Sequence, residues 1–171
     1  MPLAYIGLGS NLGDRIGQMR RAVDLLQQLG GMRVVRASPI YQNRAVGMGE
    51  TAADFLNAVV EVSSDLEPMA LLEACLAVEE RLGRHREVGG WVPRTIDLDL
   101  LAYGSTSLQQ SRLTLPHPRI AERDFVAVPL ADLAPELQIG DRTAAEIAQG
   151  LRHDELSPYH ETLLSSWIQK P

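Results

Sequence analysis

The chain has 171 residues, of which 45% are hydrophobic and 22% charged, and this composition is ordinary for a globular domain with its own core. Its net charge of −6 argues against a general nucleic-acid binder, and no apolar run approaches the roughly 20 residues that span a bilayer. The single Cys75 excludes an internal disulfide and fits a reducing cytoplasm. We expect one cytoplasmic domain over residues 1–171, monomeric and in contact with neither nucleic acid nor membrane.

The first half of the chain predicts a strand, a helix and two further strands. Residues 3–9 (LAYIGLG) form a short apolar run beside glycines, which favours a buried strand. Asp14 can cap a helix whose apolar residues recur at helical spacing until Gly30-Gly31. Residues 32–42 (MRVVRASPIYQ) predict the second strand, and residues 55–63 (FLNAVVEVS) predict the third.

The second half predicts one more helix and one more strand before a proline-rich part. Pro68 suits the first position of a helix that ends at Gly83. We expect the apolar face of this helix to contain Met69, Leu72, Cys75 and Leu76. Residues 95–103 (TIDLDLLAY) predict the next strand; loops and short helices are expected afterwards, with a candidate helical extension over 143–171. The order β-α-β-β-α-β indicates an α+β, ferredoxin-like fold with a largely antiparallel sheet and its helices on one face.

The strand TIDLDLLAY carries two carboxylates on one face. Because side chains alternate along a strand, Asp97 and Asp99 share a face, with Cα atoms about 6.6 to 6.8 Å apart. Two such charges repel each other, so either arginines or hard cations should lie between them. Oxygen ligands without a neighbouring His or Cys favour Mg²⁺, which binds one or two carboxylates together with substrate phosphates. An exposed pair without a role is the alternative.

Basic residues gather just before this strand. The segment 81–94 contains Arg81, Arg84, Arg86 and Arg94 against one acid, and guanidinium groups bind phosphate oxygens well. His117, Arg119 and Arg123 offer further donors if the chain returns to the same side. Connections 43–53 and 84–94 are long and contain glycines, so they are candidate lids. The alternative for the arginines is a solvated basic loop, and the alternative for the two connections is a disordered surface.

Two nucleotide-binding motifs are excluded. GLGSNLG, residues 7–13, lacks the spacing of a dinucleotide fingerprint and is followed by no doubly wound pattern. A phosphate-binding loop needs an internal lysine, whereas Lys170 is the only lysine of the chain. We expect the Gly-Ser-Asn turn in GLGSNLG to bend the backbone tightly into the first helix beneath a site.

Several segments together resemble the 6-hydroxymethyl-7,8-dihydropterin pyrophosphokinase family of folate biosynthesis. They occur in the order of that family and are AYIGLGSNLGDR (4–15), DFLNAVVEV (54–62), PRTIDLDLLAYG (93–104), LTLPHPRI (113–120) and RDFVAVPLADLAPEL (123–137). The resemblance implies a ferredoxin-like α+β kinase that binds ATP and a reduced pterin. It also implies transfer of the terminal pyrophosphate of ATP to the pterin hydroxymethyl group, release of AMP, and two Mg²⁺ ions bound with ATP.

The resemblance also implies roles for individual residues. Asp97 and Asp99 would bind both metal ions. Arg84 and Arg94 would hold the transferring phosphates as the catalytic pair, and the wider ATP site would include Arg86, His117 and Arg123. The pterin site would be formed by Phe55, Asn57, Phe125, Val46 and Trp91.

Two segments depart from the usual pattern of the family. Gly90-Trp91-Val92-Pro93-Arg94 replaces a basic residue followed by Trp-Gly-Pro-Arg, and Tyr41-Gln42-Asn43-Arg44-Ala45 replaces Tyr-x-Thr-x-Pro. We expect activity with altered kinetics. Two other hypotheses for the function stay open at this point. One is a Mg²⁺-dependent nucleotidyl or glycosyl transferase that uses the same Asp-x-Asp, and the other is a non-catalytic ligand-binding module built on the same sheet.

Overall fold

The central sheet is antiparallel throughout and brings the two predicted aspartates beside the N-terminal strand. The computed structural model describes residues 1–44, 53–84 and 95–164. The sheet contains β1 (Leu3–Ser10), β2 (Met32–Ala37), β3 (Tyr41–Asn43), β4 (Phe55–Ser64), β5 (Asp97–Tyr103) and β10 (Ser157–Pro158). The strands follow the order β10-β3-β4-β1-β5, and β2 also pairs with β4. The α+β, ferredoxin-like prediction is therefore confirmed.

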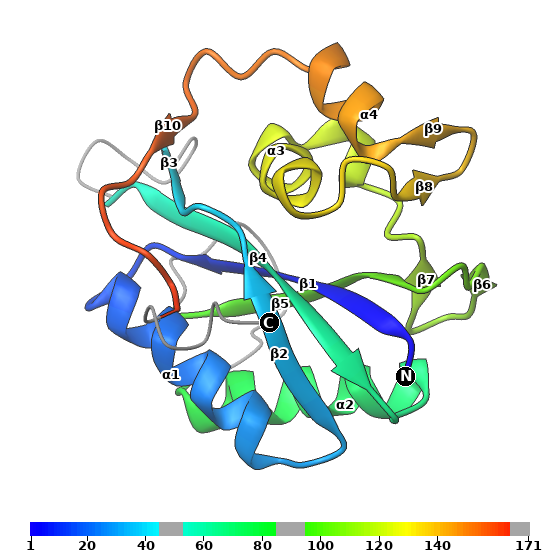
Figure 1. Ribbon diagram of the computed structural model, residues 1–171. Coiled ribbons are helices and arrows are strands. Elements are labelled where there is room, and N and C mark those ends of the chain that lie inside the picture. Colours follow the sequence, from blue (N-terminus) through cyan, green and yellow to red (C-terminus); the bar gives the residue numbers. More distant parts are fainter. Residues whose placement is uncertain (45–52, 85–94, 165–171) are drawn as a thin grey trace.

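Helices cover both faces of this sheet. α1 (Arg15–Gln28) and α2 (Pro68–Arg81) pack on one face, whereas α3 (Asp124–Leu133) and α4 (Ala144–Gly150) lie over the other (Figure 1). The sequence predicted helices on one face only, because its pattern did not show that the proline-rich part forms a covering layer. Small elements complete the chain and are β6 (Leu108–Gln109), β7 (Thr114–Leu115), the 3-10 helix η1 (Ile120–Glu122), β8 (Gln138–Ile139) and β9 (Arg142–Thr143).

The helix ends follow from local chemistry. The Asp14 side chain accepts a hydrogen bond from the backbone N–H of Gly17 at 3.0 Å and caps α1 as predicted, and Gly30 and Gly31 after the helix have positive φ. Pro68 begins α2 as predicted. The predicted single strand over 32–42 is wrong, because Ser38-Pro39-Ile40 divides it into β2 and β3. Proline has no backbone N–H to continue a ladder, and both pieces pair with β4.

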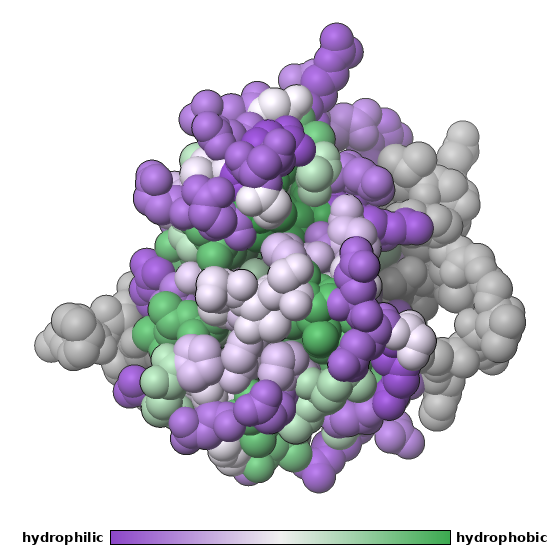
Figure 2. Space-filling view, turned by 90° about the vertical axis from the view of Figure 1, so that its right-hand side faces the viewer, coloured by the Kyte–Doolittle hydropathy of each residue, from purple (hydrophilic) through white to green (hydrophobic). Residues whose placement is uncertain are grey.

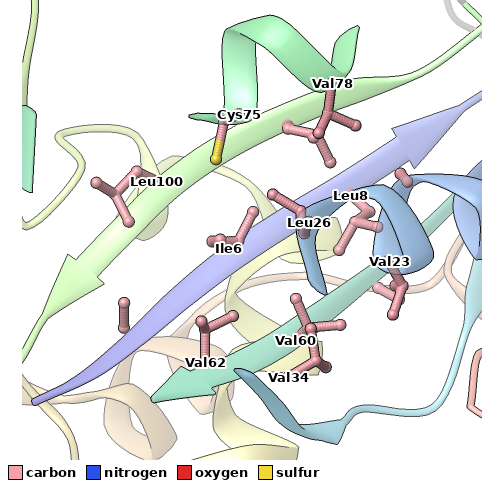
Figure 3. Packing of buried hydrophobic residues seen from close by; sticks show 14 of the residues in the cluster. Ile6, Leu8, Val23, Leu26, Val34, Val60, Val62, Cys75, Val78 and Leu100 are labelled. Atoms are coloured by element: carbon pink, nitrogen blue, oxygen red, sulfur yellow. The ribbon is translucent and has the colours of Figure 1, made fainter. Parts of the chain in front are cut away.

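The main hydrophobic core lies between the sheet and α1 and α2. Figure 3 shows Leu26 of α1 and Cys75 of α2 over Ile6 of the central strand β1. The fully buried face of α2 is formed by Leu71, Cys75, Val78 and Glu79. The predicted face was about one position off, because Met69, Leu72 and Leu76 are only half-buried. The buried face of α2 thus contains the carboxylate of Glu79, which binds Arg84.

A second, smaller core joins α3 and α4 to the other face of the sheet. Its buried residues include Tyr5, Val59 and Leu101 from the sheet, with Leu130 of α3 and Ile147 of α4. Seen from the side on which β6 and β7 lie in Figure 1, the surface is mainly hydrophilic, and hydrophobic residues show in separate areas (Figure 2). No helix within the described ranges has the length and apolarity to cross a membrane.

Candidate active site

Asp97 and Asp99 line a cavity on the face of the sheet that α3 partly covers. Strand alternation places them there as predicted, because Leu98 and Leu100 point into the main core on the opposite face. The cavity has a volume of about 740 Å³. In the antiparallel register, Asp97 lies opposite Gly9 of β1 and Asp99 lies opposite Gly7. The carboxylates therefore stand at one side of a cavity whose floor is a strand with glycines.

The two glycines keep this floor open. Gly9 lies between Asp97 on β5 and Asn57 on β4, and a Cβ at Gly9 would come within 3.0 Å of the Asn57 Oδ1 atom. A Cβ at Gly7 would meet the Leu101 side chain at 3.5 Å. The expectation that Gly9 and Ser10 form the turn into α1 is wrong, because both still belong to β1. The positive φ of the turn occurs at Gly13.

Aromatic and amide groups also line this cavity. Phe55 and Asn57 come from β4 and share a strand face, and Phe125 comes from the first turn of α3. The guanidinium carbon of Arg123 lies 5.8 Å from the centroid of the Phe125 ring, in the range of a cation–π contact. Arg119 also borders the cavity. The fold thus brings together two predicted pairs, Phe55 with Asn57 and Arg123 with Phe125, that lie far apart in the chain.

The aspartate pair is electrostatically unfavourable without a cation. Burial, and next the neighbouring Asp97, raise the pKa of Asp99 to about 6 although Arg123 opposes them. Among the described residues, no group of three or more His, Cys, Asp or Glu side chains could hold a metal. Two carboxylates with room beside them fit Mg²⁺, which takes its remaining ligands from water and phosphate. The donor set therefore fits a metal that arrives with a phosphorylated substrate.

Arg84 is held between two carboxylates. Its Nη1 atom donates to Glu79 Oε1 at 2.5 Å and also to Asp97 Oδ1. Burial lowers the pKa of Arg84, but Asp97 and Glu79 outweigh this effect, and the net shift is upward. Glu79 is 2% exposed, and its Oε1 atom also accepts the backbone N–H of Leu98 at 2.8 Å. Glu79 therefore fixes the guanidinium group to the strand that carries the aspartates.

His117 has a defined tautomer beside the same strand. Its backbone N–H donates to the Leu101 carbonyl at 2.7 Å, which attaches this loop to β5. Its Nδ1 atom accepts the backbone N–H of Arg119 at 3.2 Å, so the neutral ring carries its proton on Nε2. Burial lowers the pKa of His117, and Arg123 and Arg119 lower it further. The ring is consequently a neutral hydrogen-bond donor through Nε2.

A second cavity of about 270 Å³ adjoins the first. It is bordered by the apolar Leu72 and Leu100, by Thr114, and by His117. Asp99 borders both cavities. An elongated ligand could therefore pass from one cavity to the other across the aspartate strand.

Four of the predicted site residues, Val46, Arg86, Trp91 and Arg94, lie outside the described residues, as does most of both candidate lids. The sequence analysis did not predict three polar residues of the site, which are Glu79, Asn43 and the cavity-lining Arg44. Glu79 could have been found from its position four residues after Cys75, because a carboxylate on a buried helix face needs a partner. Asn43, which contacts Asn57, gave no comparable signal because its position depends on how β3 pairs with β4.

Comparisons with known proteins agree on one family. The model of the family described as 7,8-dihydro-6-hydroxymethylpterin-pyrophosphokinase matches residues 5–135. A 2-amino-4-hydroxy-6-hydroxymethyldihydropteridine pyrophosphokinase from Methylorubrum extorquens is 48% identical over 147 residues, which is 85% of this chain and 91% of the relative. The protein with the same name from Bacillus subtilis is 43% identical over 150 residues, covering 88% and 89% of the two chains.

Solved structures support the fold alone. The structure of wild-type Plasmodium falciparum HPPK-DHPS with pteroate matches with a TM-score of 0.66 at 13% identity. The match covers 86% of this chain and 42% of that chain, so this chain spans less than half of the solved protein. A TM-score of this size at such low identity shows that the same arrangement of strands and helices recurs there.

Proposed function

This chain belongs to the 7,8-dihydro-6-hydroxymethylpterin-pyrophosphokinase family, and we infer from that membership that it transfers pyrophosphate from ATP to 6-hydroxymethyl-7,8-dihydropterin in folate biosynthesis. The products are AMP and the pterin diphosphate. The observation that supports this activity most directly is a single cavity lined by two aspartates, two aromatic rings and an amide. We assign the residues of this cavity to the two substrates as follows.

The pterin is proposed to lie between the rings of Phe55 and Phe125, with its polar edge toward Asn57. A flat heterocycle stacks well between aromatic rings, and a carboxamide matches an edge that carries both donors and acceptors. These three side chains line the same cavity. Val46 and Trp91 remain sequence-based predictions for the same ligand.

The nucleotide is proposed to lie across the aspartate strand, with its nucleoside in the smaller cavity and its phosphates near Asp99. The side chains that can donate hydrogen bonds to these phosphates are Arg84, Arg123 and His117, the last through its Nε2 atom. Guanidinium forks neutralise phosphate charge, whereas the neutral imidazole contributes a hydrogen bond without adding charge. Arg86 and Arg94 remain sequence-based predictions for the phosphates.

Asp97 and Asp99 are proposed to hold two Mg²⁺ ions that accompany ATP. When bound, such ions draw electron density from the phosphate oxygens and neutralise charge during the transfer. The carboxylates supply oxygen ligands on a rigid strand, and Glu79 keeps Arg84 beside Asp97. Arg84 would then pass from a carboxylate partner to a phosphate partner as the site fills.

The chain itself performs positioning and charge neutralisation. The pterin hydroxymethyl oxygen forms a bond to the β-phosphorus of ATP, while the bond from that phosphorus to the α–β bridging oxygen breaks. AMP leaves with the bridging oxygen, and the hydroxyl proton passes to water. Holding the two reactants in line at a water-poor site accounts for a large part of the rate enhancement in such reactions. The rigid β4, β1 and β5 strands carry the groups that fix this alignment.

Product analysis tests the activity. With Mg²⁺, ATP and 6-hydroxymethyl-7,8-dihydropterin, we expect AMP and pterin diphosphate in equal amounts by ion-pair chromatography. Asp97→Ala and Asp99→Ala should each lower kcat/KM by at least about a hundredfold, because each removes a major source of electrostatic stabilisation. ADP as the product would indicate an ordinary kinase, and AMP retained on an acceptor would indicate a nucleotidyl transferase. Wild-type turnover in either variant would refute the assignment of the aspartates.

A further inference from the structure

Asn43 of β3 contacts the amide that faces the pterin cavity. The Nδ2 atom of Asn57 donates a hydrogen bond to the Oδ1 atom of Asn43 at 2.5 Å. In the β3–β4 register Asn43 lies opposite Phe55, so it reaches Asn57 diagonally along the same face of the sheet. Both asparagines line the cavity. Asn57 is 6% exposed, so its hydrogen-bond partners decide how its amide is oriented.

The hydrogen bond to Asn43 fixes the direction of the Asn57 amide, and the strand on its other side shows where the amide oxygen lies. The Nδ2 atom of Asn43 lies 3.4 Å from the carbonyl oxygen of Arg44, to which it donates, and this leaves Oδ1 of Asn43 as the atom that faces Asn57. On the other side, Oδ1 of Asn57 lies above Gly9, at 3.0 Å from where a Cβ would be. The amide therefore points its nitrogen toward β3 and its oxygen toward β1. Within the described part of the chain, that oxygen accepts no hydrogen bond and remains for a ligand.

The two ends of an amide have nearly the same shape but opposite hydrogen-bonding character. A rotation of 180° about the last side-chain bond would exchange an acceptor for a donor at the point above Gly9. Such a flip would turn the Asn57 carbonyl toward the Asn43 carbonyl and leave two acceptors facing each other. Asn43 thus excludes the flipped state through its own acceptor.

We propose that Asn43 is a specificity-determining positioning residue, which fixes the Asn57 amide so that its oxygen accepts from the 2-amino group on the polar edge of the bound pterin. This inference rests on the proposed function, because it takes the pterin as the ligand of the cavity. Asn43 acts through Asn57 and is not assigned a role in the transfer itself.

β3 is firmly placed for this role. β10 pairs with its outer edge (Figure 1). The backbone N–H of Tyr159 also donates to the Ile40 carbonyl at 2.8 Å. The Tyr41 hydroxyl donates to Asp132 Oδ2 at 2.5 Å, which ties β3 to α3. A strand held on both sides keeps the Asn43 acceptor at a constant place.

Two substitutions of nearly equal size separate the acceptor from the shape of Asn43. Asn43→Leu removes the acceptor, and we expect the Kd of the pterin, measured by titration calorimetry, to rise about tenfold with a smaller change in kcat, because the amide loses its fixed direction. Asn43→Asp keeps an acceptor toward Asn57, so the direction of the amide stays fixed. The Kd of the pterin for this variant should therefore lie within about twofold of the wild-type value. The KM for ATP should stay constant in both variants.

Gln42→Leu is a matched control on the same strand, because the Gln42 side chain contacts Asp54 instead and does not line the cavity. Discrimination gives a second readout: wild type should prefer the pterin over its 2-oxo analogue, and this preference should shrink in Asn43→Leu only. Thermal melting of all variants verifies that they fold.

Equal pterin affinity in Asn43→Leu and Asn43→Asp would overturn the inference, and so would an unchanged preference between the two ligands. A wild-type protein that makes AMP while Asn43→Leu behaves normally would reject the inference alone. A wild-type protein that neither binds the pterin nor makes AMP would reject the proposed function as well.

Discussion

Glu79 shows how a single buried residue can set the geometry of this site. Its side chain is almost completely buried on the face of α2 that packs against β5, and one oxygen accepts from both Arg84 and the Leu98 backbone. A buried carboxylate is costly unless it is paired and hydrogen-bonded, and both conditions are met here. Glu79 therefore couples the position of Arg84, the proposed phosphate-binding residue, to the position of the aspartate strand.

Removing Glu79 should destabilise the fold markedly. Glu79→Ala leaves a buried N–H and a mostly buried guanidinium without this partner, so we expect the free energy of unfolding to fall by about 2 to 3 kcal/mol in urea titrations. Glu73→Ala is the matched control on the same helix, because Glu73 pairs with Arg112 at an exposed site. That variant should cost less than about 1 kcal/mol. Equal losses in the two variants would contradict the structural role of Glu79.

At the level of elements, α3 connects the cavity to an ion pair at the far end of the sheet. The first turn of α3 carries Phe125, and the carbonyl of its last residue, Leu133, accepts a hydrogen bond from Arg36 Nη2 at 3.1 Å. Arg36 in turn binds both carboxylate oxygens of Glu61, at 3.0 and 2.6 Å. Tyr5 donates to the same carboxylate at 3.1 Å. A three-strand polar cluster thus holds the C-terminal end of the helix on the sheet.

Weakening this cluster should loosen α3. Arg36→Lys keeps the charge but cannot reach both Glu61 oxygens and the Leu133 carbonyl, because lysine lacks the planar fork. Since Arg36 is about half exposed, we expect a loss of only about 1 kcal/mol in the free energy of unfolding. Hydrogen exchange of α3 amides should become faster than in wild type. Arg33→Lys, at an exposed position of the same strand, is the control; α3 exchange that is unchanged in Arg36→Lys would argue against the coupling.

For the whole molecule, the order of elements could be predicted from local patterns. Strand alternation, the Asp14 cap and Pro68 each act over a few residues, and the structure has these features where the sequence placed them. The division of β2 from β3 at Pro39 and the second helical layer could not be predicted in the same way. They depend on pairing with β4 and on burial against its second face, which are contacts between distant parts of the chain.

The predictions about the site divide in the same way between local patterns and long-range contacts. Asp97 and Asp99 could be assigned to one face because a strand has a period of two. The resemblance to a family supplied Phe55, Asn57 and the other ligand-binding predictions, which local patterns alone would not have grouped. The contact between Asn43 and Asn57 requires the register of β3 on β4, and the role of Gly9 as floor requires the register of β1 on its two neighbours. Neither register can be read from spacing.

The central claim is that Asp97 and Asp99 bind the magnesium ions through which ATP is held. Its most direct test is a calorimetric titration with a non-hydrolysable ATP analogue, with Mg²⁺ or with EDTA, of wild type and of the double variant Asp97→Asn/Asp99→Asn. We predict that Mg²⁺ lowers the Kd of the analogue for wild type by at least about tenfold and has little effect on its Kd for the double variant. The effect of Mg²⁺ and the effect of the double substitution are then coupled. An undiminished effect of Mg²⁺ on the double variant would contradict the account.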